Sequence, residues 1–196
     1  MPLPSSLVAG RAVRTAAALL CIGLSGAVAH AGPPRFTVSS PTFRPGAPLP
    51  PAQVLDGFGC TGANRSPALQ WTDPPPGTQS FAITLYDPDA PTGSGWWHWV
   101  VYDLPGDLRA LPEGAGRADG SGLPAGALQG RTDFGAPGFG GACPPAGAGP
   151  HRYRLQVHAL KVPTLPVPPD ASAAMVGFLI RMNRLGVAEL QVRHGR

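Results

Sequence analysis

Alternation of apolar and polar residues predicts several β-strands along this chain. In residues 80–87, SFAITLYD, the side chains of Phe81, Ile83 and Leu85 share one face, and the residues between them share the other. Further segments with strand character are residues 35–40, 68–72, 97–104 and 153–160. The period of two residues therefore favours a protein built mainly from β-strands.

The period changes after residue 170. Apolar side chains then recur at helical spacing, at Met175, Phe178, Leu179 and Met182. Asp170 is a candidate N-cap, and the pattern breaks near Gly186. Because no crossover helices separate the earlier strands, we expect an antiparallel β-sandwich followed by one or two short C-terminal helices.

Proline and glycine are unusually frequent, with 26 and 27 among 196 residues. Such a share without periodicity is typical of disordered chains, but only 13% of the residues are charged and the apolar residues fall into strand-like runs. We therefore interpret the prolines and glycines as residues of the turns in a single β-rich domain. Its glycine-rich segment 106–150 is expected to form long functional loops.

Residues 1–31 have the composition of a cleaved secretory signal. Two arginines precede an apolar stretch, no acidic residue is present, and the segment ends in the small-residue pattern AHA. We therefore predict cleavage after Ala31 and a mature domain of residues 32–196 that is periplasmic or secreted.

Two alternatives to a cleaved signal are weaker. A transmembrane helix needs roughly 18 apolar residues, whereas residues 16–28 offer a shorter stretch that glycine and serine interrupt. A lipid anchor on Cys21 would require small residues before it, where Leu19 and Leu20 stand. The sequence thus predicts no stable membrane anchor.

The formal net charge of +4 comes partly from the leader. Without Arg11 and Arg14, 13 basic residues face 11 acidic ones, which leaves a net charge of +2. Lys161 is the only lysine, and the remaining arginines are scattered. Neither nucleic acid nor an anionic membrane is therefore an implied partner.

Cys60 and Cys143 are the two cysteines that follow the leader. An even pair in an exported protein favours a disulfide bond. Two separate buried thiols are the alternative, because sequence spacing gives no distance between the side chains.

The segment YDPDAPTGSGWWHW, residues 86–99, combines a turn with side chains that can bind a ligand. Two prolines end the preceding strand and stiffen the stretch that carries Asp87 and Asp89. The TGSG turn then reverses the chain, so we expect His98 to lie near Asp87.

Strict alternation would place Trp97 and Trp99 on one face of this second strand, and His98 with Trp96 and Val100 on the other. Taken singly, these residues have plainer interpretations. The aspartates fit a solvated turn, and a lone histidine is commonly a satisfied core residue.

Residues 138–153, GFGGACPPAGAGPHRY, form a second candidate segment. Glycines let backbone N–H groups converge on an anion, two prolines stiffen the wall, and His151 enters the following strand. A flexible surface loop is an equally good interpretation of this segment alone.

Taken together, these segments resemble the phosphatidylethanolamine-binding protein family, which includes the Raf kinase inhibitor proteins. Four stretches occur in the order of its bacterial branch: FGCTGANRSPALQW, YDPDAPTGSGWWHWVVYDLP, GRTDFGAPGFGGACPPAGAGPHRYRLQVHAL and VAELQV. The resemblance covers residues 35–193. It implies the family's β-sandwich, with a small cavity that binds phosphate-type anions and phosphorylated head groups.

Eight residues match those that line the family's cavity. They are Asp87, Asp89, Trp96, His98, Gly141, Pro145, His151 and Tyr153. Cys143 falls within the loop that forms one wall. Eukaryotic members carry a second histidine where this chain has Trp97, so the resemblance does not extend to their kinase partners.

We therefore expect an exported, non-catalytic protein that binds a small anionic or phosphorylated ligand. Histidines and backbone N–H groups can receive an anion, and an aspartate can orient an imidazole. The sequence implies no cofactor and no bound metal. One alternative is a hydrolase that uses histidine, aspartate or a metal. Another is an interaction or inhibitor module with an unidentified protein partner, a protease or a kinase, contacted through the glycine-rich loop.

Overall fold

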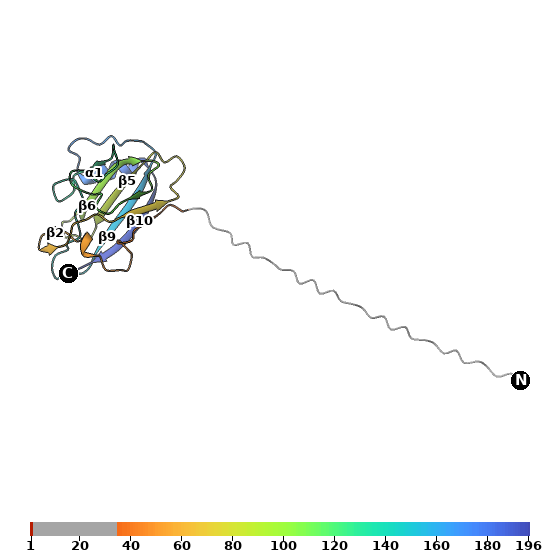
Figure 1. Ribbon diagram of the computed structural model, residues 1–196, viewed down its shortest axis with the longest axis horizontal. Helices are drawn as coiled ribbons and strands as arrows, with labels where there is room; N and C mark the ends of the chain where they lie inside the picture. Colours follow the sequence, from red (N-terminus) through yellow and green to blue (C-terminus); the bar gives the residue numbers. More distant parts are fainter. Residues whose placement is uncertain (2–34) are drawn as a thin grey trace. The chain divides into compact units, whose positions relative to one another are not determined.

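The computed structural model describes Met1 and residues 35–196 (Figure 1). The predicted leader, apart from Met1, and its cleavage site lie outside the described residues. The strands are β1 (Thr37–Ser39), β2 (Asp56–Gly57), β3 (Cys60–Thr61), β4 (Leu69–Thr72), β5 (Ser80–Asp87), β6 (Trp96–Pro105), β7 (Ala110–Leu111), β8 (Leu128–Gln129), β9 (His151–Leu160) and β10 (Arg184–His194). The helices are the 3-10 turn η1 (Pro51–Gln53) and the α-helix α1 (Ala173–Asn183).

The strands form antiparallel sheets that pack as a sandwich. A five-stranded sheet has the order β10-β9-β5-β6-β8, a three-stranded sheet the order β1-β4-β7, and β2 pairs with β3. The main core lies between the two larger sheets, where Trp71 of β4 contacts Phe81 of β5 with ring centroids 5.4 Å apart. The expected mainly β, antiparallel fold is therefore confirmed.

Strand β5 is covered on both faces, which explains its nearly continuous burial. Ile83 and Leu85 point into the main core. Ala82 belongs to a second apolar cluster on the opposite face, with Val176 and Ile180 of α1. The five-stranded sheet thus separates a core shared with the smaller sheet from a core shared with the helix.

Helix α1 presents a different face to the protein than its largest apolar residues suggest. Ser172, rather than Asp170, caps the helix, since its hydroxyl accepts from the backbone N–H of Met175 at 3.2 Å. The buried face is formed by Ala173, Val176 and Ile180. The exposed side carries Met175, Phe178 and Met182. These small and branched side chains fit closely against the sheet. Close packing, rather than the size of the apolar side chains, therefore determines which face of α1 is buried.

One α-helix follows residue 170, within the predicted number of one or two. The sequence pattern predicts helical structure at the end of the chain, but α1 ends at Asn183 and residues 184–194 form β10. Ala188 and Val192 of β10 are buried in the main core. Ten residue pairs with β9 fix this strand, and its apolar residues Ala188, Leu190 and Val192 alternate with polar ones as in a strand with one buried face. No helix in the described part of the chain is long and apolar enough to cross a membrane.

Strands β5 and β6 form the expected hairpin, but a bulge breaks its alternation. Leu85 pairs with Trp99, and Tyr86 pairs with Trp97, so His98 is an extra residue on β6. Trp99 enters the main core, whereas Trp97 packs on the helix side. The prediction that Trp97 and Trp99 share a face is therefore wrong.

The structure contains the predicted disulfide. Cys60 of β3 is bonded to Cys143, with the two Cα atoms 6.0 Å apart and 83 positions apart in sequence. This bond joins the β2–β3 ribbon to the loop before β9. Two distant loop segments are thereby held together at one end of the sandwich.

We expect the free energy of unfolding of the Cys60→Ser/Cys143→Ser variant to be about 4 kcal/mol lower than that of the oxidised protein. The crosslink closes a long loop and so reduces the conformational entropy of the unfolded chain. Urea unfolding with and without reductant measures this difference. The reductant should destabilise the wild type and leave the double variant unchanged. Equal stability of the oxidised protein and the variant would contradict a disulfide bond between Cys60 and Cys143.

His158 is buried on the helix-covered face of β9. Its side chain is 4% exposed, and its Nε2 lies 3.0 Å from the hydroxyl of Thr84. Burial, together with the nearby charges of Arg184 and Arg181, lowers the pKa of His158 to about 3. The ring is therefore neutral in the native protein at ordinary pH.

This burial predicts a loss of stability as the pH falls. The unfolded chain takes up a proton at His158 below about pH 6.5, whereas the folded ring does not, so His158 alone should lower the unfolding free energy by about 2 kcal/mol between pH 7 and pH 5. His158→Gln should remove most of that difference in urea unfolding at the two pH values. His194→Gln is the matched control, since His194 is only partly buried. Equal pH dependence in wild type and His158→Gln would refute the assignment.

Candidate functional site

A small pocket lies at one end of the five-stranded sheet, where β5 ends and β6 and β9 begin. Its volume is about 150 Å³. It is lined by Phe58, Asp87, Ala90, Pro91, Thr92, Trp96, His98, Phe134, Cys143, Pro144, Pro145, His151 and Tyr153. The hairpin turn after Asp87 and the loop before His151 form facing walls, so the two candidate segments meet here as the sequence predicted.

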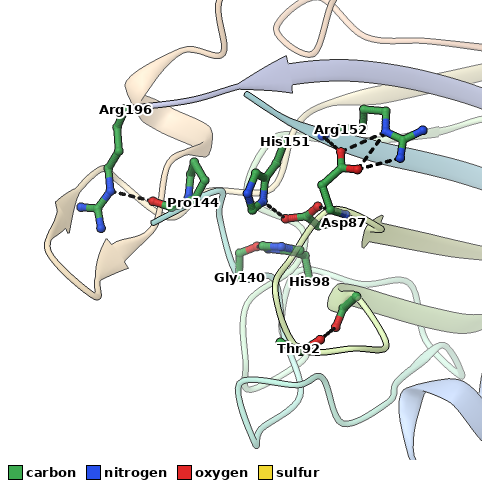
Figure 2. A network of polar contacts seen from close by, with 10 residues as sticks. Asp87, Thr92, His98, Gly140, Pro144, His151, Arg152 and Arg196 are labelled. Atoms are coloured by element: carbon green, nitrogen blue, oxygen red, sulfur yellow. Dashed lines mark hydrogen bonds and ion pairs between the residues drawn. The ribbon is translucent and has the colours of Figure 1, made fainter. Parts of the chain in front are cut away.

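An aspartate and a histidine form a buried pair in this pocket (Figure 2). Nδ1 of His151 lies 2.7 Å from Oδ2 of Asp87, and the side chains are 7% and 3% exposed. Oδ1 of Asp87 accepts from the backbone N–H of Asp89 at 2.8 Å. Because a carboxylate only accepts, Nδ1 carries the proton. Nε2 then accepts in the neutral ring and donates in the protonated ring.

His98 contributes a second imidazole with a different character. Its Nδ1 donates to the carbonyl oxygen of Gly140 at 2.8 Å, and the N–H of Gly140 donates to the carbonyl of His98 at 2.8 Å. Burial lowers the pKa of His98, although the Gly140 hydrogen bond and Asp87 oppose this shift. His98 is therefore neutral, and its Nε2 can accept a hydrogen bond.

Tyr153 supplies a hydroxyl that has no partner within the described residues. Its side chain is buried and lines the pocket, with its ring edge-on to His98 at 5.2 Å. Burial raises the pKa of Tyr153, and the charges of Asp87 and Asp89 raise it further. The hydroxyl therefore keeps its proton and is a hydrogen-bond donor without an acceptor.

Two predicted residues do not line the pocket. Asp89 binds Arg152 instead, with Oδ1 2.6 Å from Nη2 of the guanidinium and Oδ2 2.7 Å from the backbone nitrogen. These hydrogen bonds lower the pKa of Asp89 to about 2. Gly141 donates its backbone N–H to Oδ1 of Asn64 at 2.7 Å, so that N–H is not available to an anion. A Cβ at Gly141 would overlap the backbone of Leu55, which explains the glycine.

Aromatic residues at the pocket opening were missed by the sequence reasoning. Phe58 stacks on Phe134 with ring centroids 5.9 Å apart, and Phe134 lies 5.4 Å from both Trp96 and His98. Phe58 is 71% exposed and has a φ of 52°, unusual for a residue with a side chain. The sequence does contain a signal for Phe58, which lies two residues before Cys60. The disulfide between Cys60 and Cys143 brings Phe58 to the pocket wall.

A clamp outside the pocket fixes these walls to each other. Arg196 donates to the carbonyl oxygens of Pro144 at 2.7 Å, Gly59 at 2.9 Å and Phe58 at 3.2 Å. Figure 2 shows Arg196 reaching Pro144. Together with the disulfide, this guanidinium holds the loop of Phe58 against the proline wall.

The described residues contain no group of three or more histidine, cysteine, aspartate or glutamate side chains placed to hold a metal ion. Within the pocket, Cys143 is in the disulfide and the carboxylate of Asp87 is engaged with His151. The available groups are the Tyr153 hydroxyl and the two imidazoles. This arrangement suits hydrogen bonding to a small polar molecule.

Comparisons with known proteins agree with this architecture. The sequence profile of the family described as phosphatidylethanolamine-binding protein matches residues 39–194. UPF0098 protein YbcL of Escherichia coli is 52% identical over 155 residues, which cover 79% of this chain and 85% of YbcL. UPF0098 protein YbhB of Escherichia coli is 52% identical over 151 residues, which cover 76% of this chain and 92% of YbhB. LppC of Mycobacterium tuberculosis, whose name proposes a lipoprotein, is 36% identical over 155 residues, covering 79% of this chain and 70% of LppC.

A solved structure shows the same fold. The crystal structure of Escherichia coli YbcL, described as a new member of the mammalian PEBP family, superposes with a TM-score of 0.80 at 50% sequence identity. The match covers 82% of this chain and 98% of the YbcL chain. The family profile and the identity to YbcL together show that the chain belongs to the phosphatidylethanolamine-binding protein family.

Proposed function

We propose that this protein is an exported, non-catalytic binding protein for small anionic or phosphorylated ligands. The ligand class includes phosphate and the head group of a phospholipid. The binding site is the pocket of Asp87, His98, His151 and Tyr153, with Trp96, Phe134 and Pro145 as apolar walls. Its small volume suits a head group better than a whole lipid.

The buried hydroxyl of Tyr153 is the observation that carries this proposal. A buried donor without an acceptor costs about 1–3 kcal/mol, and an anionic oxygen in the pocket would remove that cost. His151 stands in the same pocket, with its ring held by Asp87. A protonated His151 adds a second donor and a positive charge toward the same ligand.

The charges of the pocket limit which anions it holds. No arginine or lysine is among the residues that line the pocket, whereas Asp87 brings a carboxylate to it. A dianion would be repelled, whereas a monoanion or a zwitterion would not. The acceptor nitrogen of neutral His98 suits the ammonium or hydroxyl group of such a head group.

The contacts of the possible nucleophiles support a binding role rather than hydrolysis. The hydroxyl of Thr92, which lines the pocket, donates to the carbonyl of Gly95 and is not bonded to either imidazole. Cys143 has no thiol while the disulfide is intact. A nucleophile would need a base within hydrogen-bond reach.

Export is supported by three observations. The Cys60–Cys143 bond is typical of an oxidising compartment, and the first residues have the composition of a secretory signal. The similarity to LppC, whose name proposes a lipoprotein, points the same way. We place the protein in the periplasm or outside the cell.

Removing the Tyr153 hydroxyl tests the site directly. We expect Tyr153→Phe to bind phosphorylethanolamine about 10- to 100-fold more weakly than wild type in calorimetric titration, the usual loss for one hydrogen bond to a charged group. Tyr102→Phe is the matched control, because Tyr102 lies in the helix-side cluster. Unchanged affinity in a natively folded Tyr153→Phe protein would place the ligand elsewhere.

Both imidazoles should contribute to binding in the same titration. His151→Gln removes the ring that Asp87 orients, and His98→Ala removes the ring whose Nδ1 bonds the carbonyl of Gly140. Each variant should bind phosphorylethanolamine about tenfold or more weakly than wild type, the usual loss for a hydrogen bond to a charged group. Unchanged affinity in both natively folded variants would exclude the imidazoles as ligand contacts. Turnover of the ligand during the titration would favour the hydrolase alternative.

A further inference from the structure

A second cavity lies on the opposite face of the five-stranded sheet, beneath α1. Its volume is about 310 Å³, larger than the pocket around Tyr153. It is lined by Thr84, Trp97, Gln156, His158, Ala174, Gly177, Phe178, Ile180, Arg181 and Arg184. None of these residues lines the first pocket, so the two cavities are separate.

Two arginines give this cavity a positive charge that the surrounding residues do not neutralise. Arg181 lies in the last turn of α1 and Arg184 begins β10. Within residues 35–196 neither guanidinium makes an ion pair with a carboxylate. Glu189, which faces Gln156 across the strand pair, is already bonded to Arg154 at 2.9 Å and to Gln156.

One of the residues that line the cavity, His158, has a buried polar atom without a partner in the described part of the chain. Nε2 of His158 bonds the hydroxyl of Thr84, but Nδ1 of His158 makes no hydrogen bond within the described residues. When the Thr84 hydroxyl donates to Nε2, the neutral ring carries its proton on Nδ1. His158 then offers one donor, which is a costly group to leave unsatisfied in a buried position.

Apolar side chains form the remaining wall. Trp97 packs on the helix side of the sheet, and Phe178 of α1 is 57% exposed beside it. A Cβ at Gly177 would lie 3.0 Å from Cη2 of Trp97, so this glycine lets the helix approach the indole ring closely. The cavity therefore combines an aromatic wall with two cationic groups and a buried donor.

We propose that this cavity is a second ligand site, for a small organic anion in which a carboxylate or phosphate group is joined to an aromatic ring. The anionic group binds Arg181 and Arg184, with the Nδ1–H of His158 as a further donor. The ring lies between Trp97 and Phe178, which are apolar and accessible. This site is independent of the ligand that Tyr153 binds.

NMR titration of the isotope-labelled protein tests this site with defined probes. Benzoate and phenyl phosphate join a ring to a charge, whereas benzyl alcohol lacks the charge and inorganic phosphate lacks the ring. We expect saturable shifts of the Gly177 and Arg181 amides with benzoate, phenyl phosphate or both. Benzyl alcohol and inorganic phosphate should bind at least about tenfold more weakly, since each lacks one half of the interaction.

Variants separate this site from the first pocket and from general charge effects. Arg181→Gln/Arg184→Gln should weaken the aromatic anions at least about tenfold, the loss expected for charge-assisted hydrogen bonds. Arg193→Gln, an exposed arginine of β10 outside this cavity, should leave the affinity unchanged, and so should Tyr153→Phe.

Three results would overturn the proposal. The first is the absence of saturable shifts in α1 with either aromatic anion. The second is equal affinity in the double arginine variant, and the third is binding of benzyl alcohol as strong as that of benzoate. Saturation by only one of the two anions would support the site and identify its preferred charged group.

Discussion

The antiparallel pairing of β5 with β9 is the constraint on which the pocket depends. Their register joins Leu85 to Leu155 and Tyr86 to Arg154, so the end of β5 and the start of β9 meet at one edge of the sheet. The carboxylate of Asp87 thereby reaches Nδ1 of His151 across 64 positions of sequence. A slip of one residue would turn these side chains to the other face and expose the core residues between them. The register that buries the core is therefore the register that assembles the site.

A bulge in β6 lets the five-stranded sheet contribute side chains to both cavities. The bulge at His98 lets two consecutive residues of β6 serve opposite faces, because Trp97 packs under α1 while His98 enters the pocket. Without the extra residue, the alternation of a regular strand would carry Trp97 and Trp99 to the same face. The main core would then gain a large ring that it has no space for, since Trp99 is fully buried there. The hairpin thus supports both cavities through one irregularity.

The sequence could predict the long strands and most of the pocket, and it failed where tertiary contacts decide. The mostly apolar run of residues 81–86 marks β5, because both of its faces have a core to fill. Residues 188–193 alternate between apolar and polar side chains, a strand signal that the prediction of a helical chain end did not use, and this segment pairs with β9 as β10. Asp89 and Gly141 matched the family's motifs, but their hydrogen bonds to Arg152 and Asn64 direct them away from the cavity. Such partners lie far away in sequence, so no local pattern reveals them.

The distribution of carboxylates explains why the two cavities should differ in what they bind. Arg152 holds Asp89 outside the first pocket, where its pKa is about 2 and its charge is neutralised by an exposed guanidinium. Asp87 is then the only acidic side chain lining that pocket, and its partner is His151. The pair is neutral in total when His151 is protonated and carries one negative charge when it is not. The cavity beneath α1 has an excess of positive charge instead. Glu189 is paired with Arg154, so the charges of Arg181 and Arg184, which line this cavity, are not neutralised. The cavity beneath α1 is therefore the better site for a ligand with a net negative charge. The first pocket suits a zwitterion, which has a positive group of its own.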